Sequence, residues 1–244
     1  MGLFKRCNKE KRAIDMQRLP AHIGFIMDGN GRYAVSRGMP RNYGHKEGVQ
    51  ALKRVIEASF DLGIKVVSFY MFSTENWKRP QQEIDYIFSL AKNFKNEVLG
   101  EYVEKGIKVV TMGDLSKLPL DLQDSINELV EETKNNDKMI VNIGLNYGGR
   151  SEIIRACNNI IADGHKEVSE ELFSEYLYTK NLPDPDIIVR TSGEMRVSNF
   201  MLYQLAYSEM IFPKKHWPEF DKGSLEEIIV EFQGRNRRFG GLKA

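Results

Sequence analysis

An apolar run near the start of the chain ends at a carboxylate rather than at a neutral turn. The stretch IGFIMDGNGRYA, residues 23–34, passes from apolar side chains to Asp28, then to two glycines around Asn30, and then to Arg32. Glycines leave backbone N–H groups accessible to an anion, and a guanidinium binds phosphate oxygens in pairs. The stretch therefore predicts a phosphate-binding loop that also carries one acidic residue.

Three other segments carry the same kinds of residue after apolar runs. Each combines arginine with hydroxyls, amides or glycines: STENWKR at 73–79, NYGGR at 146–150 and RTSGEMRVSN at 190–199. A single arginine in a loop is usually solvated, but several such segments at one edge of a sheet would together bind phosphate. We therefore expect a phosphate-binding site where these segments meet.

Asp28 would repel a phosphate ligand unless a cation lies between them. Mg²⁺ binds one or two carboxylates together with phosphate oxygens, so Asp28 is a candidate metal ligand. An aspartate before glycine more often caps a turn, and that alternative stays open. The Asn-Gly-Arg sequence that follows Asp28 favours the metal.

The segment GNGRYA also matches the G-x-G-x-x-A pattern of dinucleotide-binding loops. That fold places an acidic residue at the end of its second strand, about 20 residues further along. Here the second expected strand ends near residue 72, about twice that distance away. A dinucleotide-dependent oxidoreductase is therefore the less favoured alternative.

The elements that would position these loops follow from the apolar pattern. Short runs rich in Ile, Val, Phe and Tyr predict strands, and apolar residues at helical spacing predict helices between them. The expected strands are 23–28, 64–72, 107–113, 139–146, 186–190 and 208–212, and the expected helices are 47–62, 81–104, 120–134, 149–163, 169–178 and 223–238. This alternation predicts a single α/β domain with a six-stranded, mostly parallel sheet flanked by helices. Ligands of such sheets bind beyond the carboxyl ends of the strands, where the four loops lie.

Composition narrows the class of protein. The chain has 244 residues, which is enough for one domain with a large core, and a net charge of +1. That charge argues against general nucleic-acid binding. Cys7 and Cys157 are too few for a disulfide framework and indicate a reduced, cytoplasmic location.

The N-terminal residues 1–20 form a basic tail without the apolar core of a secretory signal. We expect a frayed, solvated tail. The alternative is peripheral contact with anionic lipid at the inner face of a membrane, supported by Leu3 and Phe4 beside the basic residues.

The same loops, in the same order, resemble the cis-prenyltransferases, and among these the bacterial undecaprenyl diphosphate synthases. The matching segments are HIGFIMDGNGRYA (22–34), RNYGHKEG (41–48), FSTENWKRP (72–80), NYGGR (146–150), RTSGEMRVSNF (190–200) and RNRRFGG (235–241). The resemblance implies a cis-prenyltransferase domain over residues 21–244, a homodimer, and a long apolar substrate tunnel. The Asp-Asp-x-x-Asp motif of trans-prenyltransferases does not occur in the sequence.

The reaction that the resemblance implies is a Mg²⁺-dependent, (Z)-selective condensation of isopentenyl diphosphate units onto an allylic diphosphate, usually farnesyl diphosphate. Its product would be a long polyprenyl diphosphate, such as undecaprenyl diphosphate for the lipid carrier of the cell wall. A non-catalytic subunit that only holds prenyl diphosphate is a second hypothesis. The presence of Asp28, Asn76, Arg190 and Arg196 speaks against it.

The resemblance also assigns roles to individual residues. Asp28 matches the essential metal-linked aspartate, and Glu209 matches a second metal contact. Asn76 matches a residue proposed in the family as proton acceptor; because a neutral amide is a poor base, we interpret it as a positioning group. The allylic diphosphate site matches Gly29, Asn30, Gly31, Arg32, Tyr33, Arg41 and His45, and the loop near the reacting carbons matches Ser73, Thr74, Glu75, Asn76, Trp77 and Arg79.

The isopentenyl diphosphate site matches Arg190, Arg196, Val197 and Ser198. Two positions depart from the family pattern: Tyr33 replaces a common Trp, and Met195 replaces a common His or Gln. The second change predicts one lost polar contact, unless Met195 points away and packs. Two further alternatives stay open: His45 taken alone would more often be structural, and Phe88, Phe94 and Val98 could belong either to the core or to the tunnel wall.

Overall fold

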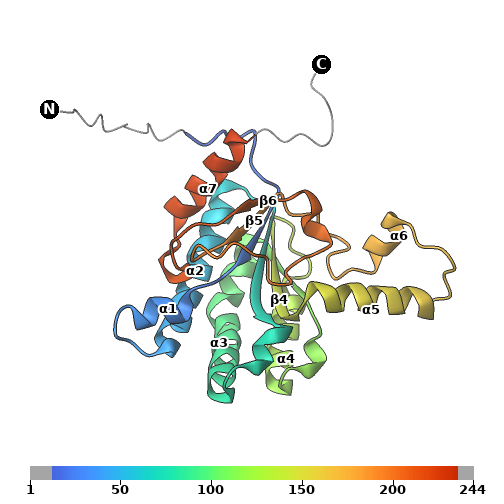
Figure 1. Cartoon of the computed structure of the whole chain (residues 1–244), viewed down its shortest axis with the longest axis horizontal. Helices are drawn as coiled ribbons and strands as arrows, with labels where there is room; N and C mark the ends of the chain where they lie inside the picture. Colours follow the sequence, from blue (N-terminus) through green and yellow to red (C-terminus); the bar gives the residue numbers. More distant parts are fainter. Residues whose placement is uncertain (1–12, 236–244) are drawn as a thin grey trace.

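The computed structural model describes residues 13–235, which form one α/β domain around a single sheet (Figure 1). The strands are β1 (His22–Ile26), β2 (Val66–Ser73), β3 (Ile107–Met112), β4 (Met139–Tyr147), β5 (Ile187–Arg190) and β6 (Glu209–Ile211). They lie in the order β3-β4-β2-β1-β5-β6, and every neighbouring pair is parallel. The α/β fold and the six strands are confirmed, with a wholly parallel sheet where a mostly parallel one was expected.

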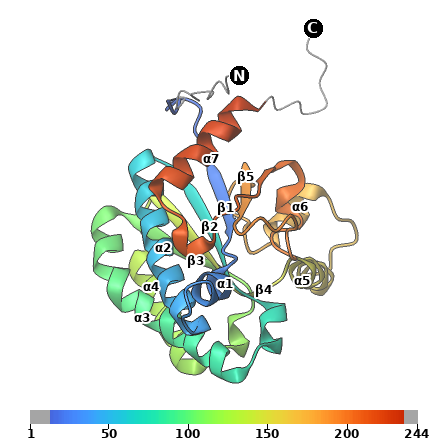
Figure 2. The same ribbon diagram turned by 60° about the vertical axis from the view of Figure 1, so that its left-hand side comes forward.

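Helices cover both faces of this sheet. They are α1 (Asn30–Val35), α2 (Arg41–Leu62), α3 (Gln81–Lys105), α4 (Leu120–Thr133), α5 (Gly149–Ala162), α6 (Glu170–Glu175) and α7 (Lys222–Gly234). Figure 2 shows α2, α3 and α4 on one side of the sheet and α5 and α6 on the other. Short 3-10 turns occupy Thr74–Lys78, Leu115–Lys117, Gln204–Tyr207 and Trp217–Glu219.

The core divides between the two faces because strand side chains alternate. Phe25 of β1 and Phe69 of β2 stack with ring centroids 5.2 Å apart, and both pack near Trp217. They belong to the larger cluster, which the helices of one face cover. Ile26 lies in a smaller cluster on the opposite face together with Phe200. Both faces of β1 are therefore buried, which explains why its sequence is continuously apolar.

The first turns of α2 were not expected to be helical, since the helix was predicted to begin at residue 47 and begins at Arg41. The glycines in this part conceal the helical pattern, yet they have a packing reason. A Cβ at Gly44 would lie 1.9 Å from the backbone oxygen of Asn30 in α1. The close approach of α1 to α2 thus needs glycine there, and α1 itself was expected only as a helix start after Gly31.

Residues 1–12 and 236–244 lie outside the described residues. The predictions for most of the basic tail of residues 1–20, for its contact with a membrane, and for most of the RNRRFGG segment therefore stay predictions. Over residues 13–235, no helix is long and apolar enough to cross a membrane.

Candidate active site

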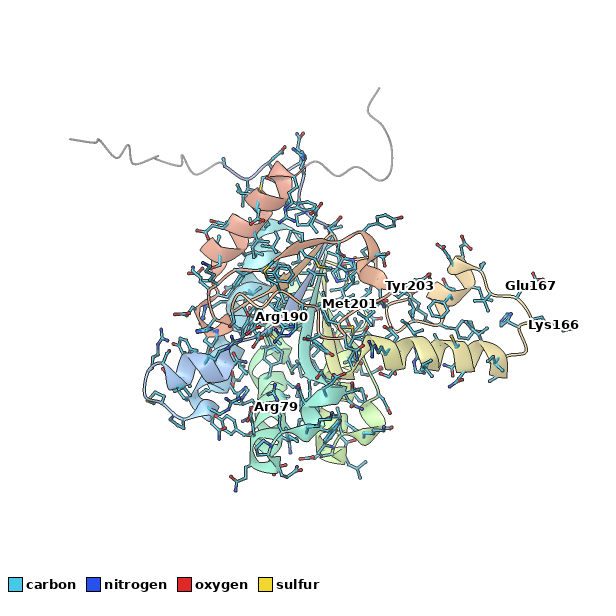
Figure 3. All side chains as sticks on the ribbon, viewed as in Figure 1. Arg79, Lys166, Glu167, Arg190, Met201 and Tyr203 are labelled. Atoms are coloured by element: carbon cyan, nitrogen blue, oxygen red, sulfur yellow. The ribbon has the colours of Figure 1, made fainter. Side chains whose placement is uncertain are left out.

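A cavity of about 640 Å³ opens at the carboxyl ends of β1, β2 and β5. Its polar side comes from the loops after these strands, and its other wall comes from α2 and α3. Figure 3 shows two of its arginines, Arg190 at the end of β5 and Arg79 just before α3. The predicted residues that line it are Asp28, Gly29, Asn30, Gly31, Arg32, Arg41, His45, Ser73, Glu75, Asn76, Arg79, Arg190 and Ser198. The sheet thus brings together most of the residues that the sequence singled out.

The backbone of Asp28 is held firmly at the end of β1. Its carbonyl oxygen accepts hydrogen bonds from the Thr191 hydroxyl at 2.7 Å, the Ser192 hydroxyl at 3.0 Å and the Trp217 backbone N–H at 3.0 Å. The next residue, Gly29, has φ +101°, and a Cβ there would lie 1.9 Å from the Ser192 hydroxyl oxygen. Only glycine suits this turn, so the Asp-Gly pair fixes where the carboxylate points.

Two guanidinium groups flank the Asp28 carboxylate. Arg190 Nη2 lies 2.9 Å from one carboxylate oxygen, and Arg32 Nη2 lies 3.0 Å from the other. Partial burial would by itself raise the pKa of Asp28, but the hydrogen bonds and charges of Arg190 and Arg32 outweigh it and lower the pKa below its usual value. Asp28 is therefore ionised at neutral pH and sits between two cations.

Arg190 anchors the loop that follows β5. Its side chain is only 6% exposed, and besides Asp28 it donates to the backbone oxygen of Arg196 at 2.8 Å and to the Ser198 hydroxyl at 2.5 Å. Glu194 then joins two neighbouring cations, since its carboxylate pairs with both Arg32 and Arg196. The loops after β1 and β5 thus form one charged network.

A second basic cluster lies across the cavity, where α2 meets α3. Arg41, His45 and Arg79 all line the cavity, and all three contact the carboxylate of Glu83, at 3.4, 3.1 and 3.1 Å. The Glu83 side chain is 11% exposed. Burial lowers the pKa of His45, an effect that Glu83 offsets only in part. His45 is therefore neutral at pH 7 in the free protein, where its Nε2–H donates to Glu83.

The five-residue turn Thr74–Lys78 after β2 forms the rim between these clusters. Asn76 Oδ1 accepts the backbone N–H of Ser73 at 3.0 Å, and Trp77 Nε1–H donates to Asn146 Oδ1 at 2.8 Å. Glu75 accepts a hydrogen bond from Asn199 Nδ2 at 3.0 Å. The turn is therefore held to the end of β4 and to the loop after β5.

Some predicted site residues do not line the cavity. The Tyr33 ring stacks on Tyr43, with centroids 6.3 Å apart, and Trp77 packs against Phe72 and Phe88. Three others also lie outside the cavity. Thr74 lies beside Gly148, and Val197 packs in the smaller core cluster. The Arg196 side chain is 60% exposed and pairs with Glu194.

The structure separates Glu209 from Asp28. Glu209 begins β6 and aligns with Ile187 at the amino end of β5, whereas Asp28 follows the carboxyl end of β1. Its carboxylate pairs with Arg235 at 2.6 Å. The expectation that Glu209 joins Asp28 at a metal is therefore not supported within this chain. The cause is register, because a carboxylate at the start of a parallel strand lies at the opposite edge from the strand ends.

Met195 lies outside the cavity with its side chain 78% exposed. At this exposure Met195 does not pack in the core, and the loss of a polar contact to metal or diphosphate stays a prediction.

The residues present are compatible with a magnesium ion that a diphosphate helps to hold. Among residues 13–235, no group of three or more His, Cys, Asp or Glu side chains could bind a metal by itself. Asp28 supplies one ionised carboxylate that faces the cavity, and Mg²⁺ commonly takes one or two carboxylates together with phosphate oxygens and water. Asp28 is thus the residue that fits the ion.

The deeper wall of the cavity is apolar. Leu52 of α2 and Ile87 and Phe94 of α3 line it and are at most 9% exposed. Phe88, Phe94 and Val98 are all buried in the larger core cluster, and Phe94 also faces the cavity. The core and the cavity wall therefore share one helix face, and Phe94 belongs to both; the tunnel stays a prediction.

Sequence reasoning missed two polar residues around the cavity, Glu83 and Asn199. Glu83 occupies the first turn of α3, where an acid is common for its effect on the helix dipole. Asn199 lies within a segment that was singled out, but no role was assigned to it. A signal for Glu83 was its place four residues after Arg79, a spacing that allows an ion pair on a helix.

Comparisons with known proteins show which family this chain resembles. A family model described as "Putative undecaprenyl diphosphate synthase" matches residues 26–240. An isoprenyl transferase of Oceanobacillus iheyensis is 44% identical over 240 residues, covering 96% of this chain and 95% of that protein. An isoprenyl transferase of Clostridium perfringens is 42% identical over 247 residues, covering 98% of each.

Two solved structures share the fold. Lavandulyl diphosphate synthase from Lavandula x intermedia, in complex with dimethylallyl diphosphate, superposes with a TM-score of 0.89 at 32% identity, over 91% of this chain and 99% of that one. A probable undecaprenyl diphosphate synthase from Campylobacter jejuni gives 0.78 at 34% identity, over 92% and 99%. The chain therefore belongs to the cis-prenyltransferase family and is a prenyl-transferring enzyme of the undecaprenyl diphosphate synthase type.

Proposed function

We propose that this enzyme condenses isopentenyl diphosphate units onto an allylic diphosphate, with Mg²⁺ and with (Z) geometry at each new double bond. Farnesyl diphosphate is the proposed primer, and the proposed product is a long polyprenyl diphosphate such as undecaprenyl diphosphate for the lipid carrier of the cell wall. One observation carries this proposal: a single cavity has an ionised Asp28 between Arg32 and Arg190 at one end and an apolar wall at the other. Such a cavity suits a ligand with a diphosphate head and a hydrocarbon tail.

We further propose that the two diphosphates bind at separate positions in the cavity. We assign the allylic diphosphate to the side formed by residues 29–32 with Arg41 and His45, because this side borders the apolar wall from α2 and α3. We assign isopentenyl diphosphate to Arg190, Arg196 and Ser198 in the loop after β5. The lavender relative was solved in complex with dimethylallyl diphosphate, an allylic diphosphate, which supports this class of substrate.

Asp28 is the residue that would hold Mg²⁺, together with diphosphate oxygens. Bound there, the ion would supply neutralisation of the negative charge that builds up on the departing diphosphate. Arg32 and Arg190, which contact Asp28 in the free protein, lie within reach to bind the oxygens of the two diphosphates.

The residues at the rim orient the reacting carbons and have no strong base among them. Asn76 uses its side-chain oxygen to accept the Ser73 N–H, so this oxygen already has a hydrogen-bond partner. We therefore assign Asn76 to positioning through its amide N–H groups. The proton lost from isopentenyl diphosphate passes to the departing diphosphate, which is the stronger base.

We also propose that the product chain extends along the apolar wall as in a tunnel.

We further propose that the enzyme is a homodimer. Helix α5 extends to one side of the molecule (Figure 1) and exposes Ile154 and Ile161, at 61% and 71%. These residues are seven positions apart and lie on one helix face, where a second copy would cover them. Light scattering after size exclusion, with Ile154→Lys as the variant, tests this directly. A monomer in the unchanged protein contradicts it.

The function itself is tested by product analysis. The purified full-length chain is incubated with farnesyl diphosphate, Mg²⁺ and radiolabelled isopentenyl diphosphate, and the dephosphorylated products are sized by chromatography. We expect a ladder that ends in a long polyprenol, with cis geometry at the added units by NMR. A product of all-trans geometry, or no incorporation at all, would contradict the proposal.

A further inference from the structure

Three segments at the carboxyl edge of the sheet meet at one residue, Asn199, and two of them, the loops after β2 and β5, line the cavity. Its Nδ2–H donates to Glu75 Oε1 at 3.0 Å, and its Oδ1 accepts the backbone N–H of Arg150 at 2.8 Å. Its backbone oxygen accepts the N–H of Gly149 at 2.7 Å. Asn199 therefore connects the loop after β2, the start of α5 after β4, and the loop after β5.

The position of the Asn199 amide is set independently of Glu75. Asn199 has φ +66° and follows Ser198 with φ +45°, a left-handed conformation that asparagine adopts more readily than most residues. Arg190 fixes the preceding residues through the Arg196 carbonyl and the Ser198 hydroxyl. The amide is thus held on both sides by groups other than Glu75, so it can serve as a fixed donor.

The fit between the three segments is close. A Cβ at Gly148 would lie 2.7 Å from Asn199 Nδ2 and 2.7 Å from the Thr74 hydroxyl oxygen. Glu75 and Asn199 both line the cavity, next to Arg190 and Ser198. The hydrogen bond between them therefore spans the rim between the Thr74–Lys78 turn and the loop assigned to isopentenyl diphosphate.

We propose that Asn199 is a positioning residue that orients Glu75, and with it the Thr74–Lys78 turn, against the isopentenyl diphosphate loop. The effect on turnover rests on the proposed function, whereas the effect on the turn does not. The basic cluster around Glu83, on the allylic side, shares no hydrogen bond or ion pair with Asn199 among those of the described residues. The consequence of losing the contact should therefore appear for isopentenyl diphosphate and not for the allylic substrate.

Asn199→Asp removes the Nδ2–H group that donates to Glu75. Aspartate retains an oxygen for the Arg150 N–H and tolerates the left-handed backbone, but it sets a carboxylate against that of Glu75. We expect kcat/KM for isopentenyl diphosphate to fall by about three- to tenfold, the range for one lost hydrogen bond. KM for the allylic diphosphate should not change. Asn159→Asp, at an exposed position of α5, is the matched control for added charge.

A second substitution restores the hydrogen bond with its donor and acceptor exchanged. Glu75→Gln alone still accepts from Asn199, and combined with Asn199→Asp it donates its amide N–H to the new carboxylate. The double variant has the same net charge as the unchanged protein. We expect it to recover to the level of Glu75→Gln alone. If Asn199 acted only through its backbone or through the start of α5, the double variant would not recover.

Tryptophan fluorescence reports the turn without any turnover. The sequence has two tryptophans, of which Trp77 in the turn is 37% exposed and Trp217 is 1% exposed. Acrylamide quenching therefore reports chiefly on Trp77. We expect stronger quenching in Asn199→Asp, with circular dichroism unchanged, and a return to the original level in the double variant.

The outcomes separate the two proposals. If Asn199→Asp leaves both quenching and kcat/KM unchanged, or if Glu75→Gln fails to restore them, Asn199 is not a positioning residue for Glu75. If the quenching pattern appears but the unchanged protein transfers no prenyl group, the proposed function fails and the orienting contact stands.

Discussion

Replacing Asp28 by alanine removes the carboxylate that lies between the guanidinium groups of Arg32 and Arg190. Arg190 and Arg32 then lose their contacts at 2.9 and 3.0 Å. The backbone at this position should stay in place, because its carbonyl oxygen is held by Thr191, Ser192 and the Trp217 N–H. The substitution therefore changes charge in the site without changing the loop that carries it.

The expected effects differ widely between stability, binding and rate. Hydrogen bonds to charged groups contribute about 1.5–3 kcal/mol each. The Asp28 side chain is 27% exposed, and its partner Arg32 is largely in water, which weakens these contacts. We therefore expect the free energy of unfolding to fall by only about 1–3 kcal/mol. Turnover should fall by about 100- to 1000-fold, the magnitude of one lost electrostatic contribution to the transition state. Without Mg²⁺, binding of an allylic diphosphate should be unchanged or tighter, since both guanidinium groups become available to it.

Three measurements on Asp28→Ala test whether this carboxylate acts with the metal or is only structural. They are single-turnover rates with excess enzyme, calorimetric binding of farnesyl diphosphate with and without Mg²⁺, and urea unfolding. Asp28→Asn preserves the shape of the side chain and should lose a comparable part of the rate. Asp124→Ala, an exposed carboxylate of α4, is the control and should leave all three quantities unchanged. If binding and turnover of Asp28→Ala fell by equal factors, the carboxylate would be structural and its assignment to the metal would be refuted.

Three further predictions concern the basic residues. Arg190→Ala and Arg196→Ala should mainly raise KM for isopentenyl diphosphate, and Arg41→Ala should raise KM for the allylic substrate; equal changes of both constants in all three variants would contradict two separate diphosphate positions. Burial lowers the pKa of His45, and a bound diphosphate favours its protonated form, so affinity for farnesyl diphosphate should increase as pH falls below neutrality and do so less in His45→Gln. Burial also lowers the pKa of His22 from its usual value of about 6.5 to about 4. Between these two pKa values, His22 binds more protons in the unfolded chain than in the folded one. The free energy of unfolding should therefore fall on acidification, and His22 should account for about 2 kcal/mol of this fall between pH 7 and pH 5. NMR titration of the His22 ring, with urea unfolding at both pH values, checks this, and an ordinary histidine pKa would contradict it.

The fold and the polar half of the cavity could be anticipated because they depend on local sequence and on the rule that parallel strands end at one edge. The apolar run before Asp28 and the glycine after it specify both the strand and the turn. Once Asp28 and Arg190 end neighbouring parallel strands, their side chains are expected to meet, and they do.

Other features depend on the register and packing of elements far apart in sequence. Glu83 and Arg41 belong to different helices, and nothing in either segment indicates that two arginines and a histidine share one carboxylate. Glu209 resembles a metal ligand by its place in the family pattern, yet the short strand β6 sets it at the wrong edge of the sheet for this chain. Tyr33 lies on the predicted loop, but the stacking of its ring on Tyr43 is a tertiary contact that no local pattern encodes.

The most direct test of the central claim is transfer from radiolabelled isopentenyl diphosphate with each component omitted in turn. The account predicts extraction of labelled polyprenyl diphosphate only when the enzyme, farnesyl diphosphate and Mg²⁺ are all present. Excess chelator should abolish it, renewed Mg²⁺ should restore it, and NAD(P) should neither bind nor alter it. Full incorporation in excess chelator, incorporation without an allylic diphosphate, or micromolar binding of NAD(P) would contradict the assignment of Asp28 and its neighbouring arginines to metal-assisted prenyl transfer.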